Sequence, residues 1–246
     1  MPPSRLAPQS QNFPTRNKPY SPNTKSFSAP KSGPRPSREQ LGLLMARYGS
    51  PVSDGILDKL WIYHQLLRKH NTDMDLTRLI GFDTIIQRHY VDCMILQKWM
   101  PFPWPSPLVD IGTGAGFPGL MIKLISPKTE MILSEPRPRR VAFLETAIKE
   151  LGMEGISVFG HKFTSRSFTQ PVTGSITRAF ESLAKTLPRL SNSLKVGGKA
   201  IFMKGPGVEE ELKEALPENY RLLQDKRYRI PLTTLDRALL VFERLH

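Results

Sequence analysis

The sequence predicts an α/β fold built on a mostly parallel, seven-stranded sheet with an antiparallel hairpin at one edge. Two observations predict it. From residue 108 onward, short apolar runs alternate with amphipathic helical patterns, as expected when each strand returns through a helix. At the end of the chain, two strand patterns follow one another with no helix between them, which indicates an antiparallel pair.

The alternating pattern gives each element an expected position. Strands are expected at 108–111, 130–134, 156–159, 175–178, 199–204, 220–229 and 238–243. Helices are expected at 118–125, 137–151, 181–194 and 208–216. Pro118 suits the first turn of the helix at 118–125, and Gly197-Gly198 is expected to end the helix at 181–194.

Residues 37–107 read as a small helical subdomain followed by a linker, and residues 108–246 as the sheet domain. Ser37 and Gln40 have the spacing of a capping box, and Ser53 can cap a second helix. A third helix is expected at about 83–99. Four prolines at alternate positions from 101 to 107 then predict an extended connection.

Residues 1–36 read as a disordered, basic, proline-rich arm. They contain nine prolines and few aliphatic residues, so they cannot bury enough apolar surface to fold. The segment contains lysines and arginines but no acidic residue. An RNA-tethering arm, a solvated tail without a role and an organelle transit peptide all fit this composition.

The charge of the chain favours a polyanionic partner. Lys and Arg number 35 against 22 Asp and Glu, which gives a formal net charge of +13 and points to nucleic acid. Cys93 is the one cysteine, so no internal disulfide and no cysteine-built metal site can form. We therefore expect no metal. No apolar run is long enough for a membrane helix, so no membrane is expected either.

A glycine-rich loop marks the expected ligand site. The first strand runs into Gly112, Gly114 and Gly116 and then directly into a helix. Glycines at this place allow a tight turn and a close approach of the backbone to a ligand at the carboxyl end of the strand. The next strand ends at Glu135, a carboxylate placed to accept hydrogen bonds from both hydroxyls of a ribose.

Asp110 favours one adenosine cofactor over another. Glu135 suits both nicotinamide dinucleotides and S-adenosylmethionine, so it does not separate them. Asp110, at the end of the first strand, is typical of Rossmann-like methyltransferases, where an acid orders the loop and meets the methionine amino group. Dinucleotide-binding folds usually have an apolar residue there. S-adenosylmethionine is therefore the expected cofactor.

Further residues resemble a known family, the bacterial 16S rRNA guanine-N7 methyltransferases, also called small-subunit methyltransferase G or glucose-inhibited division protein B. The resemblance covers about residues 40–245. Its marks are Asp75-Leu76-Thr77, Arg88-His89 with Asp92, the loop 110–119, Arg139-Arg140, Thr177-Arg178-Ala179-Phe180 and Lys204-Gly205. The Phe117-Pro118-Gly119 continuation of the loop is more specific than the glycines alone.

The resemblance implies methyl transfer from S-adenosylmethionine to N7 of one guanine in the 530-loop region of 16S rRNA. It implies cofactor contacts at Gly112, Phe117, Thr164-Ser165 and Arg178. Family members often carry Ala-Glu where this chain has Thr164-Ser165, and a hydroxyl brings no charge to that place. The substrate implied is 16S rRNA in the small ribosomal subunit or an assembly intermediate, and we expect a cytoplasmic monomer.

The expected chemistry needs few catalytic groups. Guanine N7 carries a lone pair and no hydrogen, so it can attack a sulfonium methyl without a general base. Catalysis then depends on positioning and electrostatics. Arg178 and Lys204, each at a strand end, are the expected catalytic residues, able to bind a carboxylate, a phosphate or guanine O6. Cys93 lies far in sequence from this site and is not the nucleophile that pyrimidine C5 methylation requires.

Two other functions are compatible with parts of the sequence. A nicotinamide-dependent oxidoreductase would share the glycine loop and Glu135, but Asp110 and the terminal hairpin weigh against it. A cofactor-free RNA-binding assembly factor would explain the positive charge, but it has no need for the glycine loop or Glu135.

Overall fold

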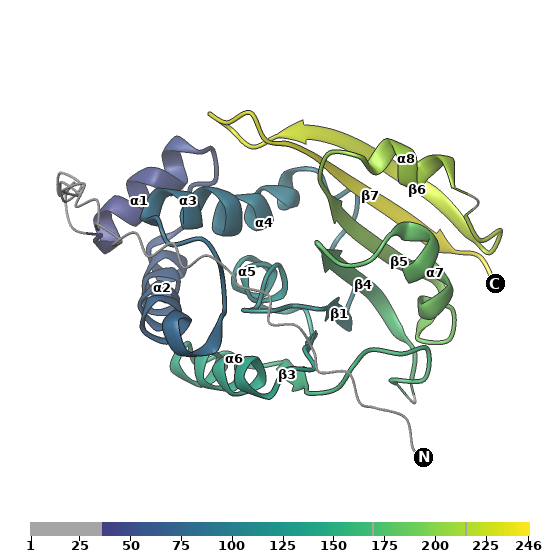
Figure 1. Ribbon diagram of the computed structural model, residues 1–246, viewed down its shortest axis with the longest axis horizontal. Coiled ribbons are helices and arrows are strands. Elements are labelled where there is room, and N and C mark those ends of the chain that lie inside the picture. The colour runs from purple at the N-terminus through teal and green to yellow at the C-terminus, as the bar shows by residue number, and fades with distance from the viewer. Residues whose placement is uncertain (1–35, 169, 215) are drawn as a thin grey trace, which may run out of the picture. The chain divides into compact units, whose positions relative to one another are not determined.

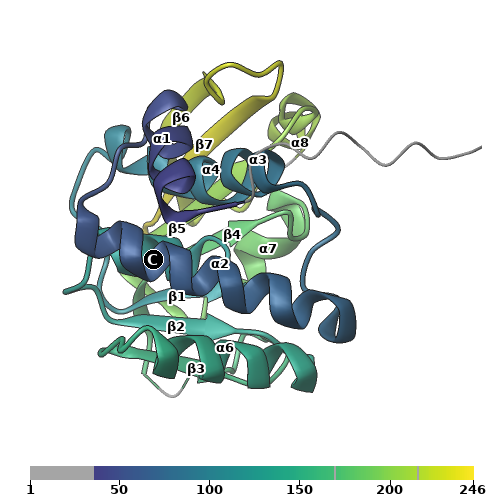
Figure 2. The same ribbon diagram turned by 90° about the vertical axis from the view of Figure 1, so that its left-hand side faces the viewer.

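A mixed seven-stranded sheet runs through the centre of the computed structural model, which describes residues 36–168, 170–214 and 216–246 (Figures 1 and 2). Its strands are β1 (Leu108–Ile111), β2 (Met131–Ser134), β3 (Ile156–Phe159), β4 (Val172–Arg178), β5 (Leu194–Lys204), β6 (Tyr220–Arg229) and β7 (Asp236–Arg244). Their order is β3-β2-β1-β4-β5-β7-β6. Strands β1 to β5 pair in parallel, and β7 pairs antiparallel with β5 and β6, which confirms the predicted fold class.

Helices cover both faces of the sheet. They are α1 (Arg38–Arg47), α2 (Asp54–Met74), α3 (Phe82–Ile85), α4 (Asp92–Met94), α5 (Gly119–Ile125), α6 (Pro138–Glu150), α7 (Leu183–Leu190) and α8 (Val208–Lys213). A π-helical stretch η1 (Ile86–Val91) and a 3₁₀ stretch η2 (Ile95–Lys98) complete the segment of α3 and α4. In Figure 1, α7 and α8 lie on the opposite side of β4 and β5 from α2 and α5.

Successive side chains of β1 enter two different cores, as the two-residue period of a strand requires. Leu108 packs with the buried residues of α1, α2, α5 and α6, whereas Val109 and Ile111 pack with those of α7. On α2, Leu57, Leu60 and Leu67 recur at helical spacing and face the first core. Strand β1 is therefore buried on both faces, and the carboxyl-terminal edge of the sheet remains for a site.

The predicted arm, residues 1–36, lies outside the described residues apart from Pro36. Residues 36–246 form one compact unit, so the predicted helical part and the sheet domain pack together. No helix in the described part of the chain is both long and apolar enough to cross a membrane.

The predicted helix 181–194 is too long at both ends. Helix α7 ends at Leu190, and β5 already begins at Leu194, so Gly197 and Gly198 lie inside a strand. Gly197 adopts a φ of 75°, and the pairing with β4 jumps from Val172↔Leu194 to Gly174↔Lys199. The two glycines therefore form a bulge in β5 rather than a helix end.

Helix α5 is held close to the sheet by Gly119. A Cβ at this position would lie 2.4 Å from Cδ2 of Leu133 and 2.8 Å from Oδ2 of Asp110. The backbone N–H of Gly119 donates to the same Asp110 oxygen over 2.7 Å. The absence of a side chain thus allows the strand β1 carboxylate to reach the first turn of α5.

We predict that Gly119→Ala lowers the free energy of unfolding by about 1–3 kcal/mol, because the added methyl group overlaps packed atoms of the strands. The matched control is Gly55→Ala in the first turn of α2, where a Cβ meets no atom within 4 Å. Urea unfolding followed by circular dichroism measures both variants. Equal stability of the two would contradict the close packing at Gly119.

Candidate active site

Expected site residues from the loop after β1 and from the ends of β4 and β5 line one cleft of about 620 Å³, namely Gly112, Gly114, Phe117, Arg178 and Lys204, whereas Asp110, Gly116 and Glu135 do not line it. The order of the sheet reverses between β1 and β4, and a crevice at such a switch point is the usual ligand site of an open α/β sheet. The cleft is lined by Leu76, Leu79, Arg88, His89, Asp92, Gly112, Thr113, Gly114, Ala115, Phe117, Arg178, Ala179, Phe180, Met203, Lys204, Gly205, Glu211 and Arg237.

The glycine loop adopts the left-handed backbone that its sequence predicts. Gly112, Gly114 and Gly116 have φ angles of 71°, 62° and 103°. At Gly112, a Cβ would lie 2.9 Å from the ring of Phe180, so this glycine makes room for a side chain of the protein itself. Ala179 brings that ring into place with a φ of 50°, a strained angle for a residue with a Cβ.

Asp110 ties the two ends of the loop together. Its Oδ2 accepts hydrogen bonds from the hydroxyl of Thr113 over 2.5 Å and from the N–H of Gly119 over 2.7 Å. The residue is fully buried, and burial raises the pKa of its carboxyl group to about 6, although both hydrogen bonds oppose the rise. Its Oδ1 is buried without a hydrogen-bond partner in the described structure. An acceptor of this kind beside a glycine cradle fits the amino group of S-adenosylmethionine.

Glu135 is anchored to the glycine loop. Its Oε2 accepts a hydrogen bond from the backbone N–H of Gly114 over 3.1 Å, and its Oε1 accepts one from the backbone N–H of Arg137 over 3.0 Å. Its exposed fraction is 3 %, and it does not line the cleft. Each carboxylate oxygen keeps a second lone pair, so contact with a ribose stays a prediction that requires access from the loop side.

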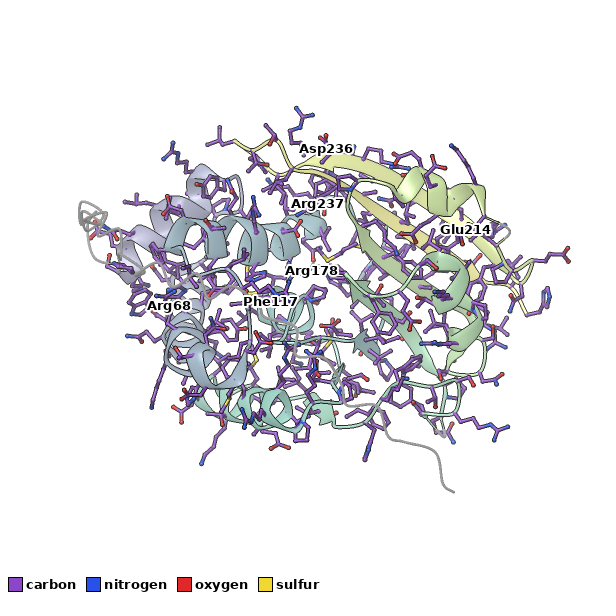
Figure 3. All side chains as sticks on the ribbon, viewed as in Figure 1. Arg68, Phe117, Arg178, Glu214, Asp236 and Arg237 are labelled. Carbon is purple, nitrogen blue, oxygen red and sulfur yellow. The ribbon has the colours of Figure 1, made fainter. Side chains whose placement is uncertain are left out.

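Arg178 joins the end of β4 to the helical segment. Its Nη1 donates to the carbonyl oxygen of Arg88 over 2.9 Å and lies 3.5 Å from Oδ2 of Asp92. Its guanidinium carbon stands 5.2 Å from the ring centre of Phe117. Figure 3 shows Phe117, Arg178 and Arg237 in succession between the helical segment and the strands.

His89 is the second partner of Arg178. Nη2 of Arg178 lies 3.0 Å from Nδ1 of His89, and because a guanidinium can only donate, Nδ1 must accept. Nε2 therefore carries the proton and donates to the Thr77 hydroxyl over 2.8 Å. Burial, followed by the charge of Arg178, lowers the pKa of His89 to about 3. The neutral imidazole stacks on Phe117 with ring centres 4.3 Å apart.

Asp92 forms ion pairs with two arginines. It is buried, with Oδ2 facing Arg178 and Oδ1 lying 3.4 Å from both Nε of Arg237 and the hydroxyl of Tyr228. Burial raises the pKa of this carboxyl group, and the two guanidinium groups act against that rise. Asp92 thus links the helical segment, β4 and the terminal hairpin at one point.

Thr164 and Ser165 lie apart from the cleft, on the connection from β3 to β4. The N–H of Thr164 donates to the hydroxyl of Ser167 over 2.7 Å, and the carbonyl oxygen of Ser165 accepts a hydrogen bond from Ser193 over 3.4 Å. Neither residue lines the cleft. Their contact with the adenine end of a cofactor stays a prediction.

Tyr63 supports the glycine loop from α2, a contact that the sequence does not predict. It is fully buried on α2, and its hydroxyl donates to the carbonyl oxygen of Ala115 in the glycine loop over 2.5 Å. The signal was present, because Tyr63 follows Leu60 and precedes Leu67 at the spacing of a buried helix face. A buried tyrosine hydroxyl needs a partner, but the sequence does not say which one.

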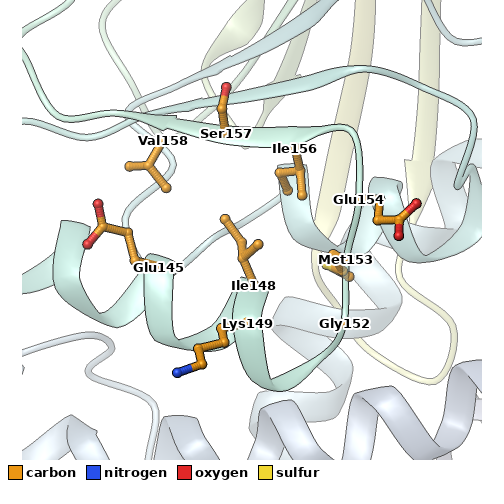
Figure 4. Close-up of a pocket in the computed structure, with 9 residues that line it drawn as sticks. All are labelled: Glu145, Ile148, Lys149, Gly152, Met153, Glu154, Ile156, Ser157 and Val158. Carbon is orange, nitrogen blue, oxygen red and sulfur yellow. The ribbon is translucent and has the colours of Figure 1, made fainter.

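A second hollow, of about 450 Å³, lies between α6 and β3 (Figure 4). Apolar side chains such as Ile148 and Val158 line it together with Glu145, Lys149 and Glu154. None of the expected site residues borders this hollow, whereas several of them line the first cleft, which is therefore the candidate active site.

Comparison with known proteins gives a consistent family. The profile of the rRNA small subunit methyltransferase G family matches residues 56–240. Ribosomal RNA small subunit methyltransferase G 2 of Syntrophobacter fumaroxidans is 41% identical over 88% of this chain. The chain spans only 43% of that protein's length. The protein of the same name from Bdellovibrio bacteriovorus is 34% identical over 79% of this chain and 76% of its own length.

Solved structures resemble the fold at low sequence identity. The protein MtNAS in complex with MTA and tNA aligns with a TM-score of 0.51 over 84% of this chain and 76% of its own, at 14% identity. The seven-stranded sheet with its glycine-loop cleft is the fold of the Rossmann-like methyltransferases. The chain belongs to the rRNA small subunit methyltransferase G family. Family membership sets aside the oxidoreductase and the cofactor-free assembly factor.

We predict that Glu135→Ala weakens binding of S-adenosylmethionine by about 1–3 kcal/mol, because the N–H of Gly114 and the ribose both lose an acceptor. Isothermal titration calorimetry measures the affinity. The control is Glu145→Ala, an exposed carboxylate on α6 that does not line the cleft. An unchanged affinity of Glu135→Ala would remove this residue from the cofactor site.

Proposed function

We propose that this protein transfers a methyl group from S-adenosylmethionine to N7 of a guanine in the 530-loop region of 16S rRNA, within the small ribosomal subunit or an assembly intermediate. The observation that carries the proposal is the cleft lined by Gly112, Gly114 and Phe117 of the glycine loop, in a chain of this family. We propose that it acts as a monomer in the cytoplasm.

The residues around the glycine loop suit the parts of this cofactor. Asp110 Oδ1 can accept from the amino group, and Glu135 can accept from the ribose. Gly112 and Gly114 leave bare backbone at the cleft, and Phe117 and Arg178 line it beside them. The bound cofactor supplies an electrophilic methyl group on a sulfonium centre. Thr164 and Ser165, on the connection from β3 to β4, are the proposed contacts of the adenine.

The side chains of the cleft suit an acceptor that has no proton to lose. His89 is neutral and has both ring nitrogens engaged, and Asp92 is held by two arginines. Cys93 is fully buried, and burial raises the pKa of its thiol, which keeps it from acting as a nucleophile. Alignment and electrostatics then carry the reaction, with Arg178 at the centre of the charged groups.

The target base must leave its helix before it can react. N7 faces the deep and narrow major groove of an RNA duplex, where side chains do not reach it. The cleft is a recess at the edge of the sheet, so the acceptor has to be an unpaired or extruded nucleotide. Arg88 and Arg237 line this recess and bring positive charge to the side where a phosphate backbone would pass.

We predict that the full chain, incubated with S-adenosylmethionine and small subunits that lack this modification, forms N7-methylguanosine at one nucleotide of the 530 loop. Borohydride reduction and aniline cleavage of the RNA map the product. Subunits with 7-deazaguanosine at the target supply the control, because they lack the accepting nitrogen. A methyl group on another atom, or on large-subunit RNA, would contradict the proposal.

The same reaction should be almost independent of pH between about 6.5 and 8.5, because no proton is removed from the acceptor. Single-turnover rates measured across this range test the point. A tenfold rise in rate per pH unit would instead indicate a general base.

A further inference from the structure

Lys204, at the end of β5, is fully occupied by partners of the protein itself. Its ammonium donates to the carbonyl oxygen of Glu181 over 2.9 Å and to the two oxygens of Glu211 over 2.8 and 3.2 Å. An ammonium has three N–H donors, so this set leaves none for a phosphate or a base. Lys204 therefore has no donor left for a substrate, and Glu211, the carboxylate that it holds, is the residue of the pair that can contact one.

Glu211 is fixed by contacts on one side only. Its Oε2 accepts from Lys204 and also from the N–H of Leu183, at the start of α7, over 2.8 Å. Its Oε1 accepts only the longer bond from Lys204 among the described residues. The side chain is 24% exposed and lines the cleft. One carboxylate oxygen is thus held rigidly, and the other has acceptor capacity left at the cleft.

Asp92, the other carboxylate of the cleft lining, is less suited to meet a ligand. Both of its oxygens face cationic or hydroxyl donors from Arg178, Arg237 and Tyr228, and the side chain is 3% exposed. Glu211 carries a single cation, Lys204, and has the greater exposure. Of the two carboxylates, Glu211 is therefore the one that can accept hydrogen bonds from a base.

The position of Glu211 matches the geometry of a guanine whose N7 is the reacting atom. The cleft is lined by the glycine loop, Phe117 and Arg178 at the ends of β1 and β4, and by residues 203–205 and Glu211 from β5 and α8. Guanine carries two adjacent donors, N1–H and the N2 amino group, on the edge opposite its imidazole ring. A carboxylate that accepts from both would leave N7 pointing away from Glu211.

We propose that Glu211 selects guanine by accepting hydrogen bonds from the Watson–Crick edge of the target base, with Lys204 as the residue that positions it. The inference rests on the proposed N7 methylation and specifies how the base is recognised. Adenine also has an N7, but it presents an unprotonated N1 to the carboxylate, and two facing acceptors repel one another. Inosine keeps N1–H but lacks the N2 amino group.

The test uses the full chain and small subunits reconstituted with guanosine, inosine or adenosine at the target nucleotide. For the wild-type protein we expect kcat/KM to be about tenfold higher or more for guanosine than for inosine, the usual effect of one lost charge-assisted hydrogen bond. In Glu211→Gln this ratio should fall to about twofold or less, mainly through a higher KM for guanosine subunits. Affinity for S-adenosylmethionine should stay within about twofold, because Glu211 does not contact the glycine loop.

Glu210→Gln is the matched control, because Glu210 is the preceding residue of α8, pairs with Lys213 and is 76% exposed. It should keep the wild-type ratio. If Glu211→Gln fails to fold, Glu211→Asp retains the charge but draws the carboxylate back by one methylene, and the ratio should fall again. A purely structural role would lower kcat/KM for guanosine and inosine by the same factor, and that result would overturn the proposal.

The two proposals fail in different ways. If wild-type protein methylates inosine at N7 as fast as guanosine, the role of Glu211 is wrong while N7 transfer stands. If the product on guanosine subunits is not N7-methylguanosine, the proposed function itself is wrong.

Discussion

The burial of one cation, the guanidinium of Arg178, determines how the rest of the site is built. Its side chain is 17% exposed, and a charge with so little water must be paired and hydrogen-bonded or the fold loses several kcal/mol. Its partners are the carbonyl oxygen of Arg88, Nδ1 of His89 and the carboxylate of Asp92. All three come from one short stretch that includes the π-helical turn η1, so pairing the charge fixes the helical segment against the end of β4.

This arrangement also determines what the cleft can do. Burial, followed by the charge of Arg178, keeps His89 neutral, and Arg178 uses the lone pair of Nδ1, so the one histidine of the cleft lining is a structural link to Thr77 rather than a base. Phe117 packs against both this imidazole and the guanidinium, and these contacts hold the end of the glycine loop. With Asp110 tying the two ends of the same loop, the cleft is a rigid receptor, suited to a reaction that depends on alignment.

The sequence predicts the parts of this site that depend on local pattern. The glycine loop, Asp110 and the strand end at Glu135 follow from a few consecutive residues, and the seven strands and their antiparallel edge follow from alternation. Contacts between distant segments could not be predicted, such as Arg178 with His89 or Tyr63 with Ala115, because spacing says nothing about which buried donor meets which acceptor. The sequence predicts correctly that Lys204 lies at a strand end, but only the packed structure reveals that its ammonium is hydrogen-bonded to Glu211. The helix end predicted at Gly197-Gly198 is wrong because glycine is typical both of helix ends and of bulges in strands.

The most direct test of the Arg178 arrangement is the protonation of His89, observed by ¹⁵N NMR of the imidazole nitrogens across pH 4 to 8. A pKa of about 3, lowered by burial and by Arg178, means that the ring stays neutral over this whole range with its proton on Nε2. The expected result is therefore a pair of unchanging resonances, one from protonated Nε2 and one from unprotonated Nδ1. A titration of His89 near its ordinary value of about 6.5, or a proton on Nδ1, would contradict the account.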